Sequence, residues 1–298
     1  MLVDTHAHLN IKAFELDREE VIKRCLENNI WIINIGTNYE TSKKAVEIAG
    51  KYPEGIFAAI GLHPINLDTG LVKVKTDELE GSHFENEFDF EKYKSLAENP
   101  KVVVIGEIGL DYYWRPKTTK KKEFFKQKQK DLLSKQLELA KELNLPVIFH
   151  CRMAHEDLLE ILNYKLKTIN YQLRGVMHGF VGTLEQLKEY LNFGFYIGFN
   201  GIIFKKIEGI KVAETSSHLS PRATSSRSVF EENIKNTPLD KILIETDCPY
   251  LIPSPVEGRN EPLYVKYVAE RIAEIKKISF EKVAEVSTEN AKRLFKLG

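Results

Sequence analysis

VDTHAHLN, residues 3–10, joins a short apolar strand pattern to two histidines, His6 and His8, spaced two residues apart. Because side chains alternate across a β-strand, residues i and i+2 point to the same side and can bind one cation. Imidazole nitrogen suits Zn²⁺ and other borderline divalent metals. The alternative is a pair of ordinary polar residues in a loop, and the rest of the chain argues against it.

Four further side chains of metal-binding type end short apolar runs elsewhere in the chain. They are Glu107, His150, His178 and Asp247. In a parallel (β/α)8 barrel the carboxyl ends of the strands meet at one face, and that face carries the active site. Taken singly, a histidine after an apolar strand is more often a core residue. Together, the six side chains predict a metal site at one end of a barrel.

Apolar, often β-branched runs alternate with amphipathic stretches along the chain. The expected strands are 2–5, 31–35, 57–61, 102–107, 147–150, 175–178, 195–199 and 242–245. The expected helices are 18–28, 39–51, 130–143, 155–166, 184–191, 261–276 and 280–297, the last starting near Ser279. Continuous apolar strands are typical of sheets buried on both faces. The pattern predicts an α/β fold, a closed (β/α)8 TIM-type barrel.

Two segments interrupt this alternation: residues 66–90, and residues 211–236 with their Ser/Thr-rich sequence. Neither has enough apolar residues for a core of its own, so both are expected to be loop insertions. A chain of 298 residues suits one barrel. We therefore expect a single domain over residues 1–298.

Composition limits the function classes. Lys+Arg and Asp+Glu are equal at 43 each, so no global field attracts nucleic acid, and phosphate binding must come from local charge or metal. The three cysteines lack close pairing, which favours reduced thiols and a cytoplasmic location. The chain opens on a strand without a signal-peptide pattern, and no apolar run approaches the ~18–20 residues that span a membrane.

Several carboxylates are candidates for chemistry. Glu107 follows five apolar residues, where a lone charge is costly to bury, and bridging two cations would remove that cost. The alternative is a solvated Glu at the barrel rim. Asp247 can bind metal and accept a proton from water. Asp4 is expected to orient a histidine, Glu245 to support the site from deeper in the strand, and Asp111 to help hold the site from a loop.

Other polar residues are assigned less specifically. Arg152 can bind a phosphate or carboxylate with two hydrogen bonds, or form a salt bridge at the rim. His63 can donate to a phosphate oxygen or cap the loop before Pro64. His155 is expected to be a helix-start residue. His83 and His218 lie in the insertions and are expected at the surface.

A basic cluster follows the strand that ends at Glu107. It comprises Arg115, Lys117, Lys120, Lys121, Lys122, Lys126, Lys128 and Lys130, with Tyr112, Tyr113 and Trp114 directly before it. Basic residues beside aromatic ones suit a single nucleic-acid strand, through phosphate contacts and base stacking. The alternative is a solvated, lysine-rich helix start.

Eight motifs, in this order, resemble those of the TatD family of metal-dependent deoxyribonucleases, which belong to the amidohydrolase-like metal-dependent hydrolases. The motifs are VDTHAHLN, IGLHP, VIGEIGLDYY, PVIFHCRMAHEDLLEIL, MHGFVGTLEQ, YIGFNG, LIETDCPYL and RNEPLYVKYVAERIA. The resemblance covers nearly the whole chain except the two insertions. Gly179 departs from it, because many members have Ser or Cys there. The insertion after the seventh strand is a second departure, on the substrate side.

The resemblance implies that His6, His8, Glu107, His150, His178 and Asp247 hold one or two divalent ions, with Mg, Mn or Zn as candidates. Glu107 would be the shared ligand. It also implies hydrolysis of DNA, with 3′-to-5′ exonuclease activity and a role in DNA repair.

We therefore expect a hydrolase of phosphodiester bonds that uses activated water. Asp247 and Glu107 are the expected catalytic residues, and His63 and Arg152 are expected to bind the phosphate. The substrate is expected to be single-stranded DNA or 3′ ends, the protein a monomer, and no membrane is involved. One alternative is a hydrolase of another ester or amide, such as D-aminoacyl-tRNA. The other is a non-catalytic nucleic-acid-binding barrel.

Overall fold

Eight parallel strands form one sheet in the order β1 to β8 in the computed structural model, which describes residues 1–72, 84–168, 172–205 and 226–298. The strands are β1 (Leu2–Ala7), β2 (Ile30–Ile35), β3 (Ile56–Ile60), β4 (Val102–Asp111), β5 (Val147–Arg152), β6 (Gly175–Met177), β7 (Tyr196–Phe199) and β8 (Ile242–Ile244). The first and last strands meet just beyond β8, where Ala7 pairs with Cys248 in an isolated parallel bridge. The sheet is therefore a nearly closed barrel, and the predicted fold is confirmed.

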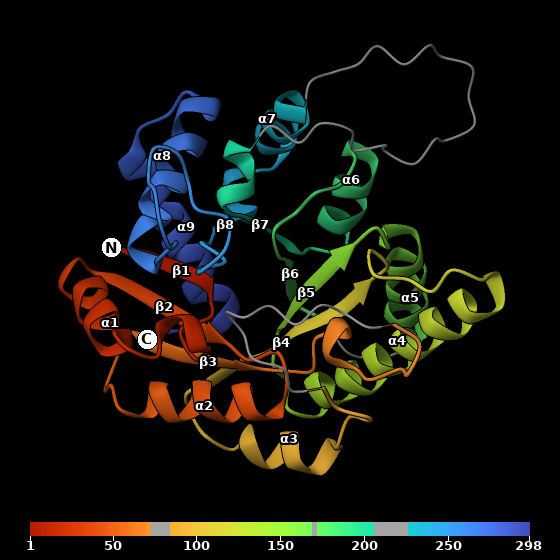
Figure 1. Cartoon of the computed structure of the whole chain (residues 1–298). Helices are drawn as coiled ribbons and strands as arrows, with labels where there is room; N and C mark the ends of the chain where they lie inside the picture. Colours follow the sequence, from red (N-terminus) through yellow and green to blue (C-terminus); the bar gives the residue numbers. More distant parts are fainter. Residues whose placement is uncertain (73–83, 169–171, 206–225) are drawn as a thin grey trace, which may run out of the picture.

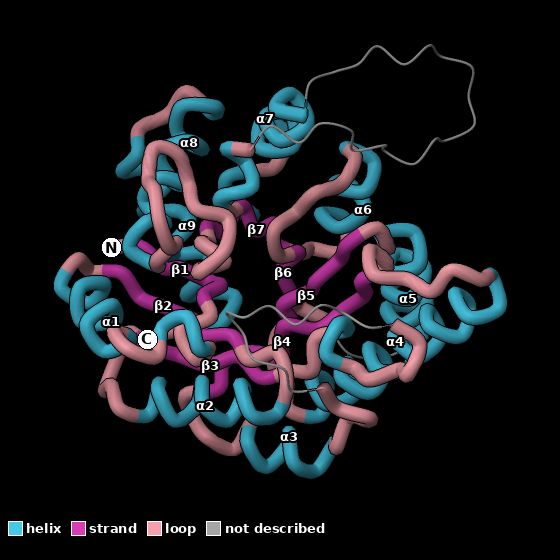
Figure 2. Tube along the Cα trace, in the orientation of Figure 1, coloured by secondary structure: helices cyan, strands magenta, loops and turns pink. Residues whose placement is uncertain are grey.

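Helices surround the barrel on the outside (Figure 1), and Figure 2 shows the strands grouped at the centre with helices around them. The α-helices are α1 (Arg18–Glu27), α2 (Tyr39–Gly50), α3 (Phe90–Leu96), α4 (Thr119–Glu142), α5 (His155–Thr168), α6 (Leu184–Asn192), α7 (Ser226–Asn236), α8 (Val265–Lys276) and α9 (Phe280–Phe295). Short 3₁₀ helices are η1 (Lys12–Phe14), η2 (Pro64–Asn66), η3 (Gly201–Phe204), η4 (Leu239–Lys241) and η5 (Pro262–Tyr264). No helix in the described part of the chain is long and apolar enough to cross a membrane.

Two apolar cores hold the barrel. One lies between the strands and the surrounding helices. The other includes Val3, Ile33 and Val104 together with Leu294 and Phe295 of α9. Adjacent residues such as Ile32 and Ile33 belong to different cores, as strand alternation requires. The expected cap of α9 is present, because the Lys282 N–H donates to Ser279 Oγ over 3.2 Å.

The predicted helix 130–143 begins earlier, since α4 includes the lysine-rich turns from Thr119 onward. The expected loop at 211–236 is wrong over 226–236, which forms α7. Phe230 and Ile234 lie four residues apart on one face of that helix and are buried, which explains why this short polar stretch is helical. His83 and His218 lie outside the described residues.

Candidate metal centre

The structure brings all six predicted metal ligands together at the carboxyl ends of the strands. His6 Nε2 lies 3.1 Å from His8 Nε2 and 3.3 Å from Glu107 Oε2. Asp247, which follows β8, places Oδ1 3.4 Å from His8 Nε2. The His6–His8 pair and Asp247 are more than 200 positions apart in the chain, so the barrel, and not local sequence, creates the cluster.

Glu107 occupies the centre of the cluster. Its Oε1 lies 2.7 Å from His150 Nδ1 and 3.8 Å from His178 Nε2. His178 Nε2 is also 3.7 Å from Asp247 Oδ2. The rings of His6 and His178 stack with centroids 3.6 Å apart. The predicted shared position of Glu107 agrees with this placement.

His8 has a defined tautomer. Its Nδ1 lies 3.2 Å from the carbonyl oxygen of Ile35, and a carbonyl can only accept, so Nδ1 carries the proton. This hydrogen bond fixes the ring so that Nε2 faces His6 and Asp247, where it can serve as a metal ligand.

His150 lies between two carboxylates. Its Nε2 is 3.0 Å from Asp111 Oδ2, and its Nδ1 faces Glu107. Burial lowers the pKa of His150, but the hydrogen bonds to both carboxylates outweigh burial and raise the pKa to about 9. The expected loop position of Asp111 is wrong, because this buried residue is the last of β4, and its carboxylate contacts the predicted ligand His150 directly.

Glu245 contacts His178 and helps to position its ring. Its Oε1 lies 2.9 Å from His178 Nδ1 and accepts the Gly179 N–H over 2.6 Å. Gly179 has a positive φ of 50°, and a Cβ there would lie 2.9 Å from Asn200 Nδ2, so glycine relieves both strain and crowding. The Gly179 N–H thereby helps to position the Glu245 carboxylate that contacts His178.

His63 also enters the cluster, with its Nε2 3.5 Å from Glu107 Oε1. Its Nδ1 accepts the backbone N–H of Ile65 over 3.1 Å at the start of η2. Because Nδ1 is an acceptor, the neutral ring carries its proton on Nε2. His63 therefore caps the loop before Pro64, as expected, and directs its Nε2–H into the site.

Asp4 does not orient an imidazole, and that prediction is wrong. Its carboxylate accepts the backbone N–H groups of His6, over 3.2 Å, and of Thr246, over 2.9 Å. Burial raises the pKa of Asp4 to about 8. Asp4 instead links β1 by hydrogen bonds to the segment after β8 that contains Asp247.

The buried carboxylates carry charge because of their surroundings. Burial alone would raise the pKa of Glu107, but its electrostatic interactions with the surrounding imidazoles and the hydrogen bond with His150 hold that pKa well below its usual value. The pKa of Asp247 is also lowered, against burial, by His178 and His8. Burial and His178 lower the pKa of His6, which favours its neutral form.

The side chains of the cluster are suitable ligands for divalent cations. His6, His8 and Asp247 form one group whose ligand atoms lie within 4.8 Å of one another, and His6, Glu107 and His178 form a second. His63, Glu107 and His150 form a third, although the Nε2 proton of His63 marks that ring as a donor. The atoms that converge in these groups are imidazole nitrogens and carboxylate oxygens, a donor set that suits divalent metals.

Arg152 lies at the rim, exposed, at the end of β5. Its guanidinium carbon is 3.7 Å from the Tyr113 ring centroid. Within the described ranges the structure records no carboxylate at ion-pair distance from Arg152, so the expected alternative of a rim salt bridge finds no support there.

The basic cluster divides into two parts. Lys126 and Lys130 lie 3.8 Å and 3.2 Å from the carboxylate of Asp157, which also accepts the Tyr112 hydroxyl. These two lysines belong to a network that joins α4 to α5. Lys120 and Lys121 are exposed in the first turns of α4, where both the nucleic-acid interpretation and the solvated-helix alternative still apply.

His155 begins α5, as expected, and lies outside the cluster. Its Nε2 lies 3.1 Å from the carbonyl oxygen of Val181, so Nε2 donates and Nδ1 accepts from the Tyr190 hydroxyl over 2.9 Å. Burial lowers the pKa of His155 to about 4.

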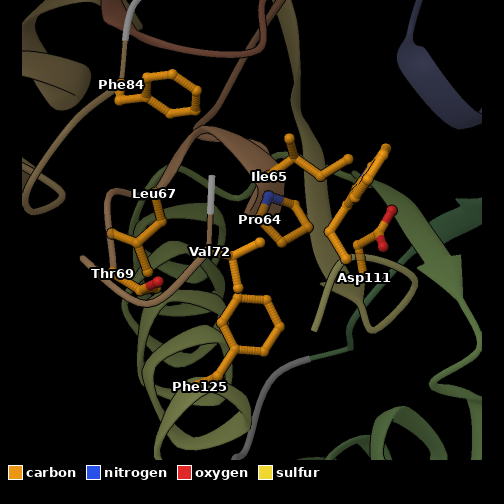
Figure 3. Close-up of a pocket in the computed structure, with 9 residues that line it drawn as sticks. Pro64, Ile65, Leu67, Thr69, Val72, Phe84, Asp111 and Phe125 are labelled. Atoms are coloured by element: carbon orange, nitrogen blue, oxygen red, sulfur yellow. The ribbon is translucent and has the colours of Figure 1, made fainter. Parts of the chain in front are cut away.

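An apolar pocket adjoins the centre on the η2 side. Figure 3 shows Ile65, Leu67, Val72 and Phe125 around it, with Asp111 at its side. Because Asp111 also contacts His150, this carboxylate forms the boundary between the pocket and the metal-binding cluster.

Sequence reasoning missed the residues that hold Asp247. Asn260 Nδ2 donates to the carbonyl oxygens of Thr246, over 3.0 Å, and of Tyr250. Next to it, Arg259 pairs with Asp17 and Glu261. The only available signal was the position of both residues in the closing motif RNEPLYVKYVAERIA.

A family model described as TatD related DNase matches residues 3–296. The chain belongs to the TatD family. It is 39% identical, over the full length of both chains, to a Bacillus subtilis (strain 168) protein named "Uncharacterized metal-dependent hydrolase YabD". It is also 30% identical to the "3'-5' ssDNA/RNA exonuclease TatD" of Erwinia tasmaniensis, covering 99% of this chain and 100% of that protein.

Solved structures agree with the TatD assignment. The crystal structure of YJJV, a TatD homolog from Escherichia coli K12, aligns with a TM-score of 0.75 at 27% identity, covering 100% of this chain and 98% of that one. The protein is thus a metal-dependent hydrolase of the TatD family, with a cluster of histidines and carboxylates able to bind metal.

Proposed function

We propose that this TatD-family hydrolase cleaves phosphodiester bonds of single-stranded DNA, acting as a 3′-to-5′ exonuclease. The observation that carries the proposal is Glu107, a buried carboxylate contacted by His6, His63, His150 and His178 at the mouth of the barrel. The substrate is inferred from the relatives named 3'-5' ssDNA/RNA exonuclease. The free cysteines agree with the reducing, cytoplasmic location that we propose.

We assign one or two divalent ions, Mg, Mn or Zn, to His6, His8, Glu107, His150, His178 and Asp247. The chemistry that bound cations supply is polarisation of the phosphoryl group and acidification of water. No serine or cysteine stands among these six side chains, so hydrolysis proceeds by direct attack of water.

The residues of the chain then have separate tasks. Asp247, held by Asn260 through Thr246, accepts the proton of the attacking water and returns it toward the leaving oxygen. His63 donates its Nε2–H to a phosphoryl oxygen. Arg152 binds the phosphate at the rim through the edge of its guanidinium.

The test is cleavage of one DNA strand labelled at the 3′ end in one sample and at the 5′ end in another. Reactions contain Mg, Mn, Zn or EDTA, and the enzyme is wild type, Asp247→Asn, or Asp240→Asn as an exposed control. A 3′-to-5′ exonuclease releases the 3′ label first and leaves a ladder of 5′-labelled products. We expect metal-dependent cleavage that Asp247→Asn abolishes and Asp240→Asn preserves. An intact strand with metal bound to the protein would instead direct the search to another ester or amide.

A further inference from the structure

Tyr113 and Arg152 form an exposed stack beside the metal-binding cluster. The Arg152 guanidinium lies over the Tyr113 ring, and Tyr113 keeps 49% of its surface accessible. The neighbouring Met153 is 61% exposed. Three apolar or planar side chains therefore face solvent just beyond the paired ends of β4 and β5, where a protein surface ordinarily has charged groups.

The stack is fixed to the centre by the backbone. The Tyr113 N–H donates to Asp111 Oδ1 over 2.9 Å, and Oδ2 of the same carboxylate contacts His150. The Tyr112 N–H donates to the carbonyl oxygen of Arg152 over 2.9 Å. The carboxylate that orients a predicted metal ligand therefore also sets the position of Tyr113.

Trp114 supports Tyr113 from the side. Their rings are 5.2 Å apart at an interplanar angle of 89°, and Trp114 lines the apolar pocket of Figure 3. The Trp114 side chain is thus partly buried, while Tyr113 is exposed.

We propose that Tyr113 and Arg152 form a stacking platform for an unpaired nucleobase next to the phosphate that is cleaved, an inference that rests on the proposed function. Aromatic rings and guanidinium planes are the groups on which single-stranded bases stack. A stacked guanidinium keeps its N–H edge free for the phosphate, so both roles of Arg152 are compatible. A base inside a duplex cannot reach such a platform, which selects single strands.

The competing account is that the stack only holds the β4–α4 loop against β5. In that case, loss of the stack changes the stability of the protein. Any effect on DNA binding is then the same for a base-bearing strand and for an abasic strand. The two accounts differ in what they predict for a strand with abasic sites at its 3′ end.

The experiment measures the Kd of metal-loaded enzyme for a fluorescent, phosphorothioate-linked strand that resists cleavage, using anisotropy. A second strand of equal length has abasic sites at the 3′ end. The variants are Tyr113→Leu, Tyr113→Phe and Arg152→Lys, with Tyr164→Leu as an exposed tyrosine control on α5.

We expect Tyr113→Leu and Arg152→Lys to weaken binding of the base-bearing strand by about tenfold or more, while binding of the abasic strand changes much less. Tyr113→Phe and Tyr164→Leu should bind like wild type. Equal losses on both strands, or no preference of the wild type for the base-bearing strand, would overturn the platform.

The two proposals fail separately. If unmodified DNA is cleaved but binding is indifferent to bases and to Tyr113, the platform is wrong and the nuclease stands. If base-dependent binding requires Tyr113 but unmodified DNA stays intact, the platform stands and the proposed hydrolysis is wrong.

Discussion

His150 Nδ1 lies 2.7 Å from Glu107 Oε1, the shortest of the contacts that surround this buried carboxylate. The other three come from His6, His63 and His178, so histidines positioned by β1, β3, β5 and β6 converge on one group from β4. A buried carboxylate is costly unless opposite charge or a cation compensates it. This relationship makes Glu107 the group on which the centre depends.

Glu107→Gln preserves volume but removes the charge. We expect kcat/KM for DNA to fall more than about 10²-fold, in the range of removing a catalytic acid–base group, together with a loss of bound metal. Metal content by atomic emission and initial cleavage rates check this. Glu98→Gln, an exposed control, should match wild type. Full activity in Glu107→Gln would show that the carboxylate is not a ligand.

Metal removal should lower thermal stability as well as activity. A cation that binds only the folded state stabilises it by roughly 2.7 kcal/mol at a hundredfold excess over its Kd. For a domain of this size that corresponds to a rise in Tm of roughly 4 °C. Thermal unfolding of chelator-treated protein, before and after addition of Mn or Zn, measures the shift. An unchanged Tm with every metal would argue against a resident site.

His63→Gln should separate substrate binding from metal binding. Because His63 Nδ1 accepts the Ile65 N–H, the ring acts as a donor, so its loss should lower kcat by about 10- to 100-fold. Metal stoichiometry should stay at the wild-type value. If the variant loses a metal ion instead, His63 belongs to the ligand set.

The environment of His155 predicts that the folded protein loses stability in acid. Its pKa is lowered to about 4 in the folded protein from an ordinary 6.5, so its neutral form is favoured by folding. This contribution is fully present above pH 6.5 and is lost as pH falls toward 4, with a maximum of about 3 kcal/mol. Urea unfolding at several pH values should show a shallower loss for His155→Gln than for wild type. Parallel curves for the two proteins would contradict this assignment.

Arg259→Lys should destabilise the segment that carries Asp247. Arg259 contacts both oxygens of Asp17, at 2.9 Å and 2.5 Å, and lies over the Phe14 ring, a geometry that lysine cannot reproduce. We expect a loss of about 1–2 kcal/mol in the free energy of unfolding by urea. Lys23→Arg, which changes an exposed helix residue, serves as the control. A variant as stable as wild type would show that charge alone suffices.

The strands and the six clustered side chains could be predicted because each follows an apolar run whose end is marked by a polar residue, as at Glu107 and Asp247. In a barrel, such ends meet whatever the loop lengths between them. Their metal-binding role stays a prediction until an ion is measured.

The supporting contacts were harder to predict because they depend on backbone geometry. Asp4 shares strand β1 with His6, yet it binds backbone N–H groups and no imidazole. Asn260 contacts Thr246 across more than ten residues of loop, and Arg259 contacts Asp17, which is distant in sequence. Sequence spacing carries no information about either contact. α7 was missed because its buried apolar face, which includes Phe230 and Ile234, is short and lies in a polar stretch.

Anomalous diffraction from crystals grown with Mn or Zn tests the central claim most directly. We predict one or two anomalous peaks within bonding distance of His6 Nε2, His8 Nε2 and the carboxylates of Glu107 and Asp247, absent from crystals of Asp247→Ala or greatly weakened there. Metal-dependent cleavage by the same preparation, with no peak at these side chains or with a peak elsewhere in the barrel, would contradict the account.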